Sequence, residues 1–192
     1  MSEVHERRKR RTRQSIQEHA MRLFLEQGFE TTTVNQVAEA AEVSAMTVYR
    51  HFPTKEHLVL SDDYDPDILE LVRAREPGEP LVTRIGRALA DGLSRLSEPE
   101  LDLLLRRIRL MLSAPALRAR LLENQHATQA AVVEALRGER TDPEWEFRLR
   151  ICADACFTAT TAALIRWAET DDAHRPGELV HRAIDYLAEE TG

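Results

Sequence analysis

The chain is poor in cysteine and has no long apolar run. It has only two cysteines, Cys152 and Cys156, and neither belongs to a pattern with metal-ligand spacing. These counts argue against a disulfide framework and against a zinc finger. No apolar run approaches the roughly 18 residues of a membrane-spanning helix, and no hydrophobic segment follows the charged N-terminus. We therefore expect neither a transmembrane helix nor a secretory signal, and we expect a cytoplasmic protein.

The sequence also lacks the motifs that accompany common catalytic sites. Its seven histidines form no HExxH or HxH pattern, and there is no glycine-rich phosphate loop and no GxSxG. The acidic run at residues 62–65 lacks the spacing and the glycine of a calcium loop, so a solvated connector is the better interpretation. Cys152 and Cys156 could bind a metal or sense oxidation, but two small core residues explain them better. We expect no enzyme, no cofactor and no metal site.

The remaining composition is that of an ordinary soluble globule, with 43% hydrophobic and 31% charged residues. No stretch alternates as a strand would, and several show helical periodicity. We therefore predict an all-α protein of about nine helices. A three-helix head at residues 1–61 would precede a larger helical body at residues 62–192. There is no internal repeat and no low-complexity segment.

Charge is distributed unevenly along the chain. The formal net charge is −7, but residues 1–60 hold nine Lys/Arg against eight Asp/Glu, and the remainder holds 17 against 25. Six basic residues lie within seven positions, from Arg7 to Arg13. This basic run is either a solvated terminus or an arm that follows the DNA backbone or enters the minor groove. Its position just ahead of the segment described next favours the arm, with Arg10 and Arg11 as DNA contacts.

The stretch from Thr31 to Glu56 has the pattern of a helix, a tight turn and a second helix. Thr33 and Ser44 are suitable N-caps, because their hydroxyls can accept from free amides of the first turn. Apolar residues at helical spacing would form a small local core, and they are Val34, Val37, Ala38, Ala41, Val48 and Phe52. The second helix would keep an outward face that fits a DNA major groove, and its residues are Ala45, Met46, Thr47, Tyr49, Arg50 and His51.

Other helix boundaries follow from caps and breakers. We predict a first helix from about Thr12 to Gln27, ended by Gly28. In the body, a capping box opens a helix at Ser97, and another helix restarts at Pro115 and continues to just before Gly138. Proline after Asp142 marks the start of a long helix that extends to about Thr170, and the last helix begins near Pro176.

The segment from Arg13 to Leu60 resembles the DNA-binding segment of the tetracycline-repressor (TetR) family of bacterial regulators. The matching pieces are Ala20-Met21-Arg22-Leu23-Phe24, Gly28-Phe29, Thr32-Thr33-Val34, Val37-Ala38, Ala41, Val43-Ser44, Thr47-Val48-Tyr49, His51-Phe52 and Lys55-Glu56. One departure is Glu42, which stands in the turn where the family usually has glycine. A non-glycine residue with positive φ costs free energy, so this turn is either different or strained.

The resemblance implies a regulator that binds a double-stranded DNA operator of two half-sites. By matching position, Thr33, Tyr49, His51 and Lys55 would contact phosphates, and Ser44 would lie at the same surface. Ala45, Met46, Thr47 and Arg50 would face the bases. The resemblance also implies a homodimer through the last two helices. The small residues between Cys152 and Ala163 agree with such close helix packing, and equally with a central helix of a monomer.

The resemblance further implies a small-molecule effector held in the helical body. Polar residues on otherwise apolar stripes are candidates to line its site, with Met111 and Phe157 as apolar wall, and each could instead be an exposed or satisfied residue. The polar candidates are Arg109, Asn124, Gln125, His126, Gln129 and Cys156. The segment from Arg107 to Leu122 resembles a TetR subgroup that senses hydrophobic or acyl-CoA-like metabolites.

Two other classes of function stay open. One is a helical ligand-binding or scaffold protein whose head has lost DNA binding, for which Glu42 is the hint. The other is an enzyme whose site lies on the helical body.

Overall fold

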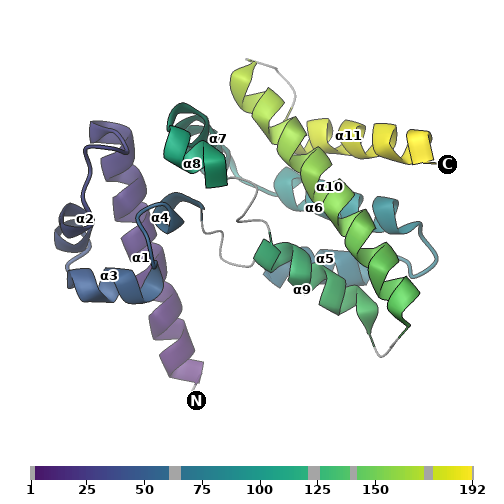
Figure 1. Cartoon of the computed structure of the whole chain (residues 1–192), viewed down its shortest axis with the longest axis horizontal. Helices are drawn as coiled ribbons and strands as arrows, with labels where there is room; N and C mark the ends of the chain where they lie inside the picture. Colours follow the sequence, from purple (N-terminus) through teal and green to yellow (C-terminus); the bar gives the residue numbers. More distant parts are fainter. Residues whose placement is uncertain (1–2, 61–65, 121–125, 139–141, 171–174, 192) are drawn as a thin grey trace. The chain divides into compact units, whose positions relative to one another are not determined.

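A computed structural model of the chain describes residues 3–60, 66–120, 126–138, 142–170 and 175–191 (Figure 1). Eleven helices and no strand are found in these ranges, so the all-α prediction is confirmed. The chain divides into two compact units. The first holds Met1–Ser61 and Arg109–Asn124, and the second holds Asp62–Ile108 and Gln125–Gly192. Among the described helices, none combines the length and the low polarity required to cross a membrane.

The first unit begins with a helix longer than expected. Helix α1 spans Glu3–Gln27, so the predicted start near Thr12 is wrong. The basic run is therefore helical. The reason lies in composition: the segment has neither proline nor glycine and is rich in Arg, Glu and Gln, which favour helix. The helix ends where predicted, because Gly28 adopts a φ of 91° and its N–H donates to the carbonyl of Phe24 at 3.0 Å.

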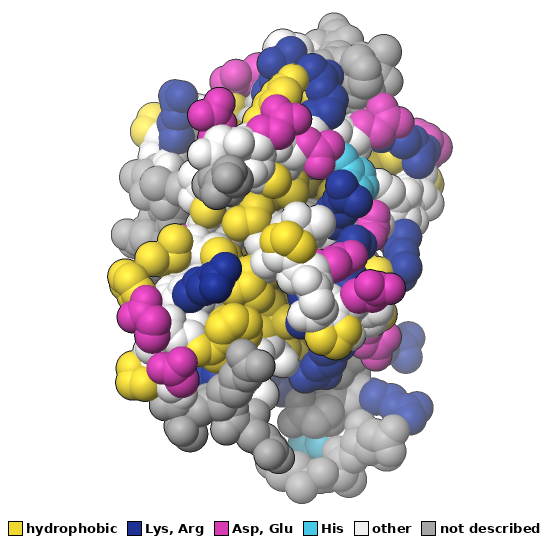
Figure 2. Space-filling model, turned by 90° about the vertical axis from the view of Figure 1, so that its right-hand side faces the viewer, with side chains coloured by type: hydrophobic (Ala, Val, Ile, Leu, Met, Phe, Trp, Pro, Cys, Tyr) yellow, Lys and Arg dark blue, Asp and Glu magenta, His cyan; other side chains and the backbone are white. Residues whose placement is uncertain are grey.

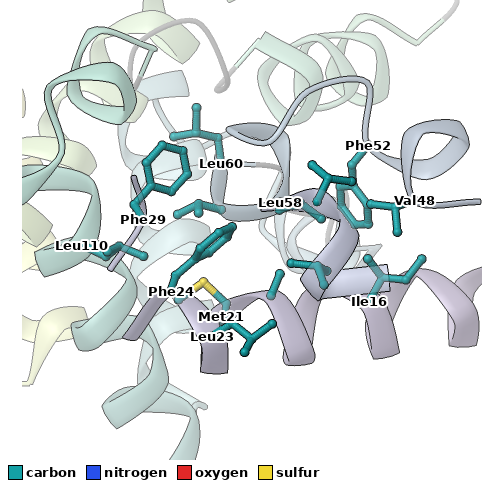
Figure 3. Packing of buried hydrophobic residues seen from close by; sticks show 14 of the residues in the cluster. Ile16, Met21, Leu23, Phe24, Phe29, Val48, Phe52, Leu58, Leu60 and Leu110 are labelled. Atoms are coloured by element: carbon teal, nitrogen blue, oxygen red, sulfur yellow. The ribbon is translucent and has the colours of Figure 1, made fainter. Parts of the chain in front are cut away.

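Three short helices pack on α1 to make the head: α2 (Val34–Ala40), α3 (Ala45–His51) and α4 (His57–Leu60). Their shared core holds Ile16 and Phe24 of α1 together with Val48, Phe52 and Leu58, each at most 1% exposed (Figure 3). The phenyl rings of Phe24 and Phe29 lie 5.1 Å apart, centre to centre. This core fixes α2 and α3 against the longer helix.

A segment far along the sequence completes the first unit. Leu110, near the end of α7 (Glu98–Ser113), is buried in the same cluster as the head residues (Figure 3). Ala114, and Leu117 of α8 (Pro115–Arg120), belong to that cluster too. The sequence predicts that this segment belongs to the body and that a helix continues from Pro115 to just before Gly138. Within that range the structure describes α8 and α9 (His126–Arg137), and they belong to different units.

The second unit is built on α5 (Pro66–Ala74), α6 (Leu81–Ser94), α10 (Pro143–Glu169) and α11 (Pro176–Thr191), with α9 and most of α7. The predicted start of α10 is confirmed, since Asp142 Oδ1 accepts from the N–H of Glu144 at 3.1 Å. At the start of α7, the Glu100 carboxylate accepts from both the N–H and the hydroxyl of Ser97. These hydrogen bonds lower the pKa of Glu100.

The core of the second unit lies where α6, α10 and α11 pack together. Ile85, Leu149, Val180 and Ile184 are almost fully buried there. The cysteine- and alanine-rich side of α10 faces this core, since Ala153, Cys156 and Ala163 belong to the cluster and both tryptophans pack against it. The buried small residues Ala153, Cys156 and Ala163 thus serve packing inside the unit. The opposite side of α10 keeps Phe147 and Ile151 exposed.

Candidate nucleic-acid interface

Helix α2 begins with a complete capping box. Thr33 Oγ1 accepts from the N–H of Gln36 at 3.2 Å, and Gln36 Oε1 accepts from the N–H of Thr33 at 2.7 Å. Two otherwise unpaired amides are satisfied in this way, so the first turn is fixed by its own side chains. Thr33 is exposed, as a residue that contacts phosphate must be.

The turn between α2 and α3 is a Schellman motif with Glu42 at its left-handed position. The N–H of Val43 donates to the carbonyl of Ala38 at 2.9 Å, and the N–H of Glu42 donates to that of Glu39 at 3.1 Å. Glu42 has a φ of 54°, a conformation that costs a non-glycine residue about 1 kcal/mol. Glu42 therefore accommodates the strain, and the turn keeps its full hydrogen bonding.

Helix α3 has a capped start and an exposed outer face. Ser44 Oγ accepts from the N–H of Thr47 at 3.1 Å, and the two hydroxyls lie 2.8 Å apart. The side chains of Met46 and Tyr49 are 69% and 49% exposed, which is unusual for large apolar groups in a folded head. The helix thus presents an apolar and aromatic surface that its own unit does not cover.

The other residues predicted for this face differ in exposure. Arg50 is exposed, and Thr47 and His51 are half-buried. Ala45 is also half-buried and packs against the head core, so the prediction that it faces fully outward needs correction. The reason is its position in the first turn, next to the buried Val48 on the inner side.

Two basic side chains contact aromatic rings and backbone carbonyls within the head. The guanidinium of Arg13 lies over the Phe52 ring and donates to the carbonyl of His51 at 2.6 Å. The ammonium of Lys55, predicted to bind phosphate, lies 4.3 Å from the centre of the Phe29 ring and donates to backbone carbonyls between α1 and α2. Sequence spacing alone could not reveal either arrangement, because the partners lie more than 20 residues away.

The basic run lies on the exposed first part of α1. Arg7, Arg8, Lys9 and Arg11 are all exposed. The side chain of Arg10, which we also predicted to contact DNA, lies outside the described part of the structure. A positively charged helical segment ahead of the head core can attract the phosphate backbone over distances comparable to the Debye length.

The predicted effector residues divide between the two units. Arg109 is exposed and Met111 half-buried in the first unit, whereas Gln129, Cys156 and Phe157 belong to the second. Asn124 and Gln125 lie outside the described residues, as does the side chain of His126. The structure therefore does not gather the predicted set within one unit.

Two buried polar groups of α10 lie on its inner side. Burial raises the pKa of the Cys156 thiol to about 12, and its Sγ donates to the carbonyl of Val82 at 3.4 Å. The hydroxyl of Thr160 is buried and has no hydrogen-bond partner in the described part of the chain. Our sequence reasoning missed Thr160, and an inward-facing threonine among alanines is the signal that could have found it. Among the described residues, no group of three or more His, Cys, Asp or Glu side chains could hold a metal ion.

Comparisons with known proteins agree with the geometry of the head. Residues 16–61 match the family model described as "Bacterial regulatory proteins, tetR family", and residues 79–192 match the one described as "MftR C-terminal domain". The HTH-type transcriptional regulator TcmR of Streptomyces glaucescens is 34% identical over 182 residues, which cover 88% of this chain and 79% of TcmR.

Solved structures give the same result. FadR of Thermus thermophilus, a TetR-family transcriptional repressor in complex with lauroyl-CoA, is 29% identical with a TM-score of 0.51, covering 92% of this chain and 93% of FadR. The fatty acid degradation regulator FadR of Bacillus halodurans, at 18% identity and a TM-score of 0.52, covers 92% and 94% and supports the fold alone. The chain therefore belongs to the tetR family of bacterial regulatory proteins, and it is a ligand-responsive, DNA-binding transcriptional regulator.

Proposed function

We propose that this protein is a homodimeric, cytoplasmic repressor that binds an operator of two half-sites and is released from it by a small molecule. The observation that carries the proposal is the outer face of α3. Met46 and Tyr49 are exposed on a short, capped helix whose opposite side is locked into the head core by Val48. A rigid helix with an uncovered face is the element that docks in a major groove.

Two kinds of DNA contact follow from residue type. Met46 can contact a thymine methyl group, and Thr47 and Arg50 can hydrogen bond to base edges. Hydroxyls, an imidazole and cations around this surface would hold phosphates, which fixes the register without reading sequence. The residues predicted for this role are Thr33, Ser44, Tyr49, His51, Lys55 and the basic run, Arg10 and Arg11 included. Ala45 would add a small contact at the edge of the base-facing group.

The division of roles can be tested with duplexes selected from random sequence by the wild-type protein. Met46→Ala should change which bases are preferred when selection is repeated with the variant. Arg11→Met should instead weaken binding to selected and random duplexes alike, and lower the slope of log affinity against log salt by about 0.9. If both variants gave the same uniform loss, the assignment of Met46 to base reading would be wrong.

Dimer formation would use the outward faces of α10 and α11. Three of the large hydrophobic side chains left exposed in the second unit lie there: Phe147 at 59%, Ile151 at 51% and Tyr186 at 58%. Figure 2 shows one face of the molecule on which hydrophobic side chains gather among charged ones. Large exposed apolar groups on adjacent helices are typical of a surface that a second copy covers, and two heads can then read two half-sites.

Analytical ultracentrifugation tests this assignment. Ile151→Glu should convert the dimer to a monomer and abolish tight operator binding, because a charge would be buried at the interface. Leu103→Glu is the matched control, since Leu103 is 46% exposed on α7 and lies outside this surface. Equal sedimentation of wild-type protein and Ile151→Glu would place the dimer contact elsewhere.

The effector would be a hydrophobic, acyl-CoA-like molecule. This rests on the resemblance of residues 107–122 to acyl-CoA-sensing members and on the lauroyl-CoA held by the Thermus relative. Thr160 joins the predicted residues Gln129 and Phe157, which belong to the same unit, since a buried hydroxyl without a hydrogen-bond partner in the described part of the chain offers a hydrogen bond to a ligand. Release from operator DNA should occur with lauroyl-CoA and not with CoA alone. Release by neither lauroyl-CoA nor free laurate would eliminate this effector class.

A further inference from the structure

Asn35 in the first turn of α2 is an exposed carboxamide that the head itself does not use. Its side chain forms no hydrogen bond within the described part of the chain. The neighbouring carboxamide is engaged in the capping box: Gln36 Oε1 accepts from the N–H of Thr33 at 2.7 Å and from the Thr33 hydroxyl at 3.0 Å. Gln36 Nε2 donates to Oε1 of Gln27 at 3.5 Å. Of these two carboxamides, Asn35 is the one whose acceptor and donors are available to a ligand.

Asn35 lies on the flank of α2 that leads into α3. Gln36 turns to one flank of the helix, where it meets Gln27 at the end of α1. Successive residues of a helix are rotated by about 100°, and residues four and seven apart share a side. Asn35 therefore shares the other flank with Glu39 and Glu42, which are also exposed. The turn into α3 lies at Glu42, so this flank ends where α3 begins.

This position brings Asn35 within reach of the groove that α3 would occupy. From Asn35 to the turn is roughly 10 Å along α2, at a rise of 1.5 Å per residue. B-DNA rises 3.4 Å per base pair, so this offset corresponds to about three base pairs. Val37 of α2 and Val48 of α3 are buried in the same core, which fixes the offset between the two helices. A side chain on this flank can thus meet a base pair within about three of those that α3 contacts.

The outer face of α3 offers few groups that can hydrogen bond to bases. Met46, its most exposed large residue, can make apolar contacts only. The hydroxyl of Thr47 lies 2.8 Å from that of Ser44, so its hydrogen bonding is partly used within the helix. Arg50 is then the strongest hydrogen-bonding group of the predicted base-facing set. A carboxamide on the adjacent flank of α2 would add a second.

The charges on this flank favour a base edge over a phosphate as the partner of Asn35. The carboxylates of Glu39 and Glu42 repel phosphates, whereas adenine N6 and cytosine N4 present N–H donors in the major groove. The side chain of Asn35 carries an acceptor and a donor side by side, and this pair matches the N6 donor and the N7 acceptor of adenine.

We propose that Asn35 is a specificity-determining residue, which reads an adenine in each half-site from α2, beside the residues of α3. The inference rests on the proposed docking of the head on DNA.

Selection from random duplexes, repeated with two variants, tests the assignment. Alanine has a higher helix propensity than asparagine, so Asn35→Ala keeps the head folded. A bidentate contact discriminates between bases by about 5- to 150-fold, so the wild type should prefer adenine by this factor at one position where Asn35→Ala accepts all four bases. Asn35→Asp should prefer cytosine at that position, because a carboxylate only accepts and cytosine N4 donates.

A modified base tests the same contact from the side of the DNA. 7-Deaza-adenine replaces N7 by a C–H group and keeps the pairing with thymine. Placed at the selected adenine, it should weaken binding by the wild type about 2- to 10-fold and leave binding by Asn35→Ala unchanged, since one hydrogen bond is lost only where Asn35 is present. Met46→Ala is the matched control: it keeps Asn35 and should stay sensitive to the modified base.

Three outcomes would contradict these proposals, and they differ in what they refute. Equal losses of affinity for selected and random duplexes in Asn35→Ala, with unchanged base preferences, would make Asn35 a phosphate contact. Wild-type preferences in both variants, with equal sensitivity to 7-deaza-adenine, would show that another residue reads the adenine. Failure of the wild-type protein to prefer any duplex would instead refute the proposed function, and that result is obtained from the wild type alone.

Discussion

The guanidinium of Arg13 lies 4.2 Å from the centre of the Phe52 ring, and its Nη1 donates to the carbonyl of His51 at 2.6 Å. The two partners of the hydrogen bond are 38 residues apart in sequence. The carbonyl belongs to the last residue of α3, where the helix has unsatisfied acceptors and partial negative charge. Arg13 thus joins α1 to the C-terminal end of the helix proposed to read DNA.

Replacing Arg13 should destabilise the head through this contact. Arg13→Met removes a hydrogen bond from a charged donor and the stacking on Phe52, so we expect a loss of about 1–3 kcal/mol in the free energy of unfolding. Urea unfolding at neutral pH measures the change. Arg22→Met is the control, because Arg22 and Glu26 form an ion pair with both side chains about half exposed. That change should stay within about 0.5 kcal/mol. Equal losses of unfolding free energy in both variants would contradict a stabilising role of the Arg13 contact.

Hydrogen bonds between residues close together in the sequence could be predicted from it, and those between distant residues could not. Thr33, Ser44 and Asp142 were identified as caps because an N-cap and its partner lie two or three residues apart. Gly28 was identified as the end of α1 for the same reason. In contrast, the carbonyls around Lys55 come from 23 to 26 residues away. No spacing rule predicts that these groups meet.

The extent of the head could likewise not be predicted from patterns in the sequence. We predicted helix only from Thr12 because the apolar stripe of α1 begins at Ile16, yet helix propensity alone extends it back to Glu3. The association of Leu110 and Leu117 with the head core was also not foreseen, since their apolar spacing fits packing in either unit. Periodicity identifies the face of a helix that is buried but not the neighbour that buries it.

Removing the positive-φ strain at Glu42 should stabilise the head. Glu42→Gly adopts a φ of 54° without a Cβ penalty, so the free energy of unfolding should rise by about 0.5–1 kcal/mol. Glu39→Gly is the matched control: it lies within helix α2 and should lose about 1 kcal/mol. Thermal and urea unfolding report both changes. If neither variant, or both, had a higher free energy of unfolding than the wild type, the result would contradict backbone strain at Glu42 in the Schellman turn.

A second substitution at Glu42 distinguishes the effect of its negative charge from the effect of its backbone strain. Glu42→Gln keeps a side chain at the positive-φ position and removes a carboxylate that is exposed next to α3. We expect its stability to stay near that of the wild type and its affinity for all duplexes to rise, because a negative charge near the phosphates is lost. Anisotropy titrations at two salt concentrations measure this. Unchanged affinity would place Glu42 beyond the reach of the DNA backbone.

Helices α6 and α11 approach closely at Gly86. A Cβ built there would lie 2.5–2.6 Å from three side-chain atoms of Ile184, which is 1% exposed. Gly86→Ala should therefore cost about 1–3 kcal/mol in spite of its better helix propensity. Gly92→Ala on the same helix meets its nearest atom at 3.6 Å and should stabilise by about 0.5–1 kcal/mol.

A double-mutant cycle tests whether Ile184 is the cause. In the Ile184→Ala background the space around Gly86 is open, so Gly86→Ala should lose most of its cost there. A coupling of about 1 kcal/mol or more between the two substitutions is the expected result. Additive effects would mean that the cost of Gly86→Ala arises from some other neighbour.

The two cysteines of α10 should differ sharply in reactivity. Burial raises the pKa of the Cys156 thiol to about 12, so at pH 8 almost none of it is thiolate, the reactive form. Burial also raises the pKa of Cys152, but its side chain is only partly covered. With Cys152→Ser, labelling of Cys156 by iodoacetamide at pH 8 should require unfolding and accelerate with urea in step with the loss of helical signal. With Cys156→Ala, Cys152 should react in the folded protein. Rapid labelling of Cys156 in the native state would show that solvent reaches the interior of the second unit.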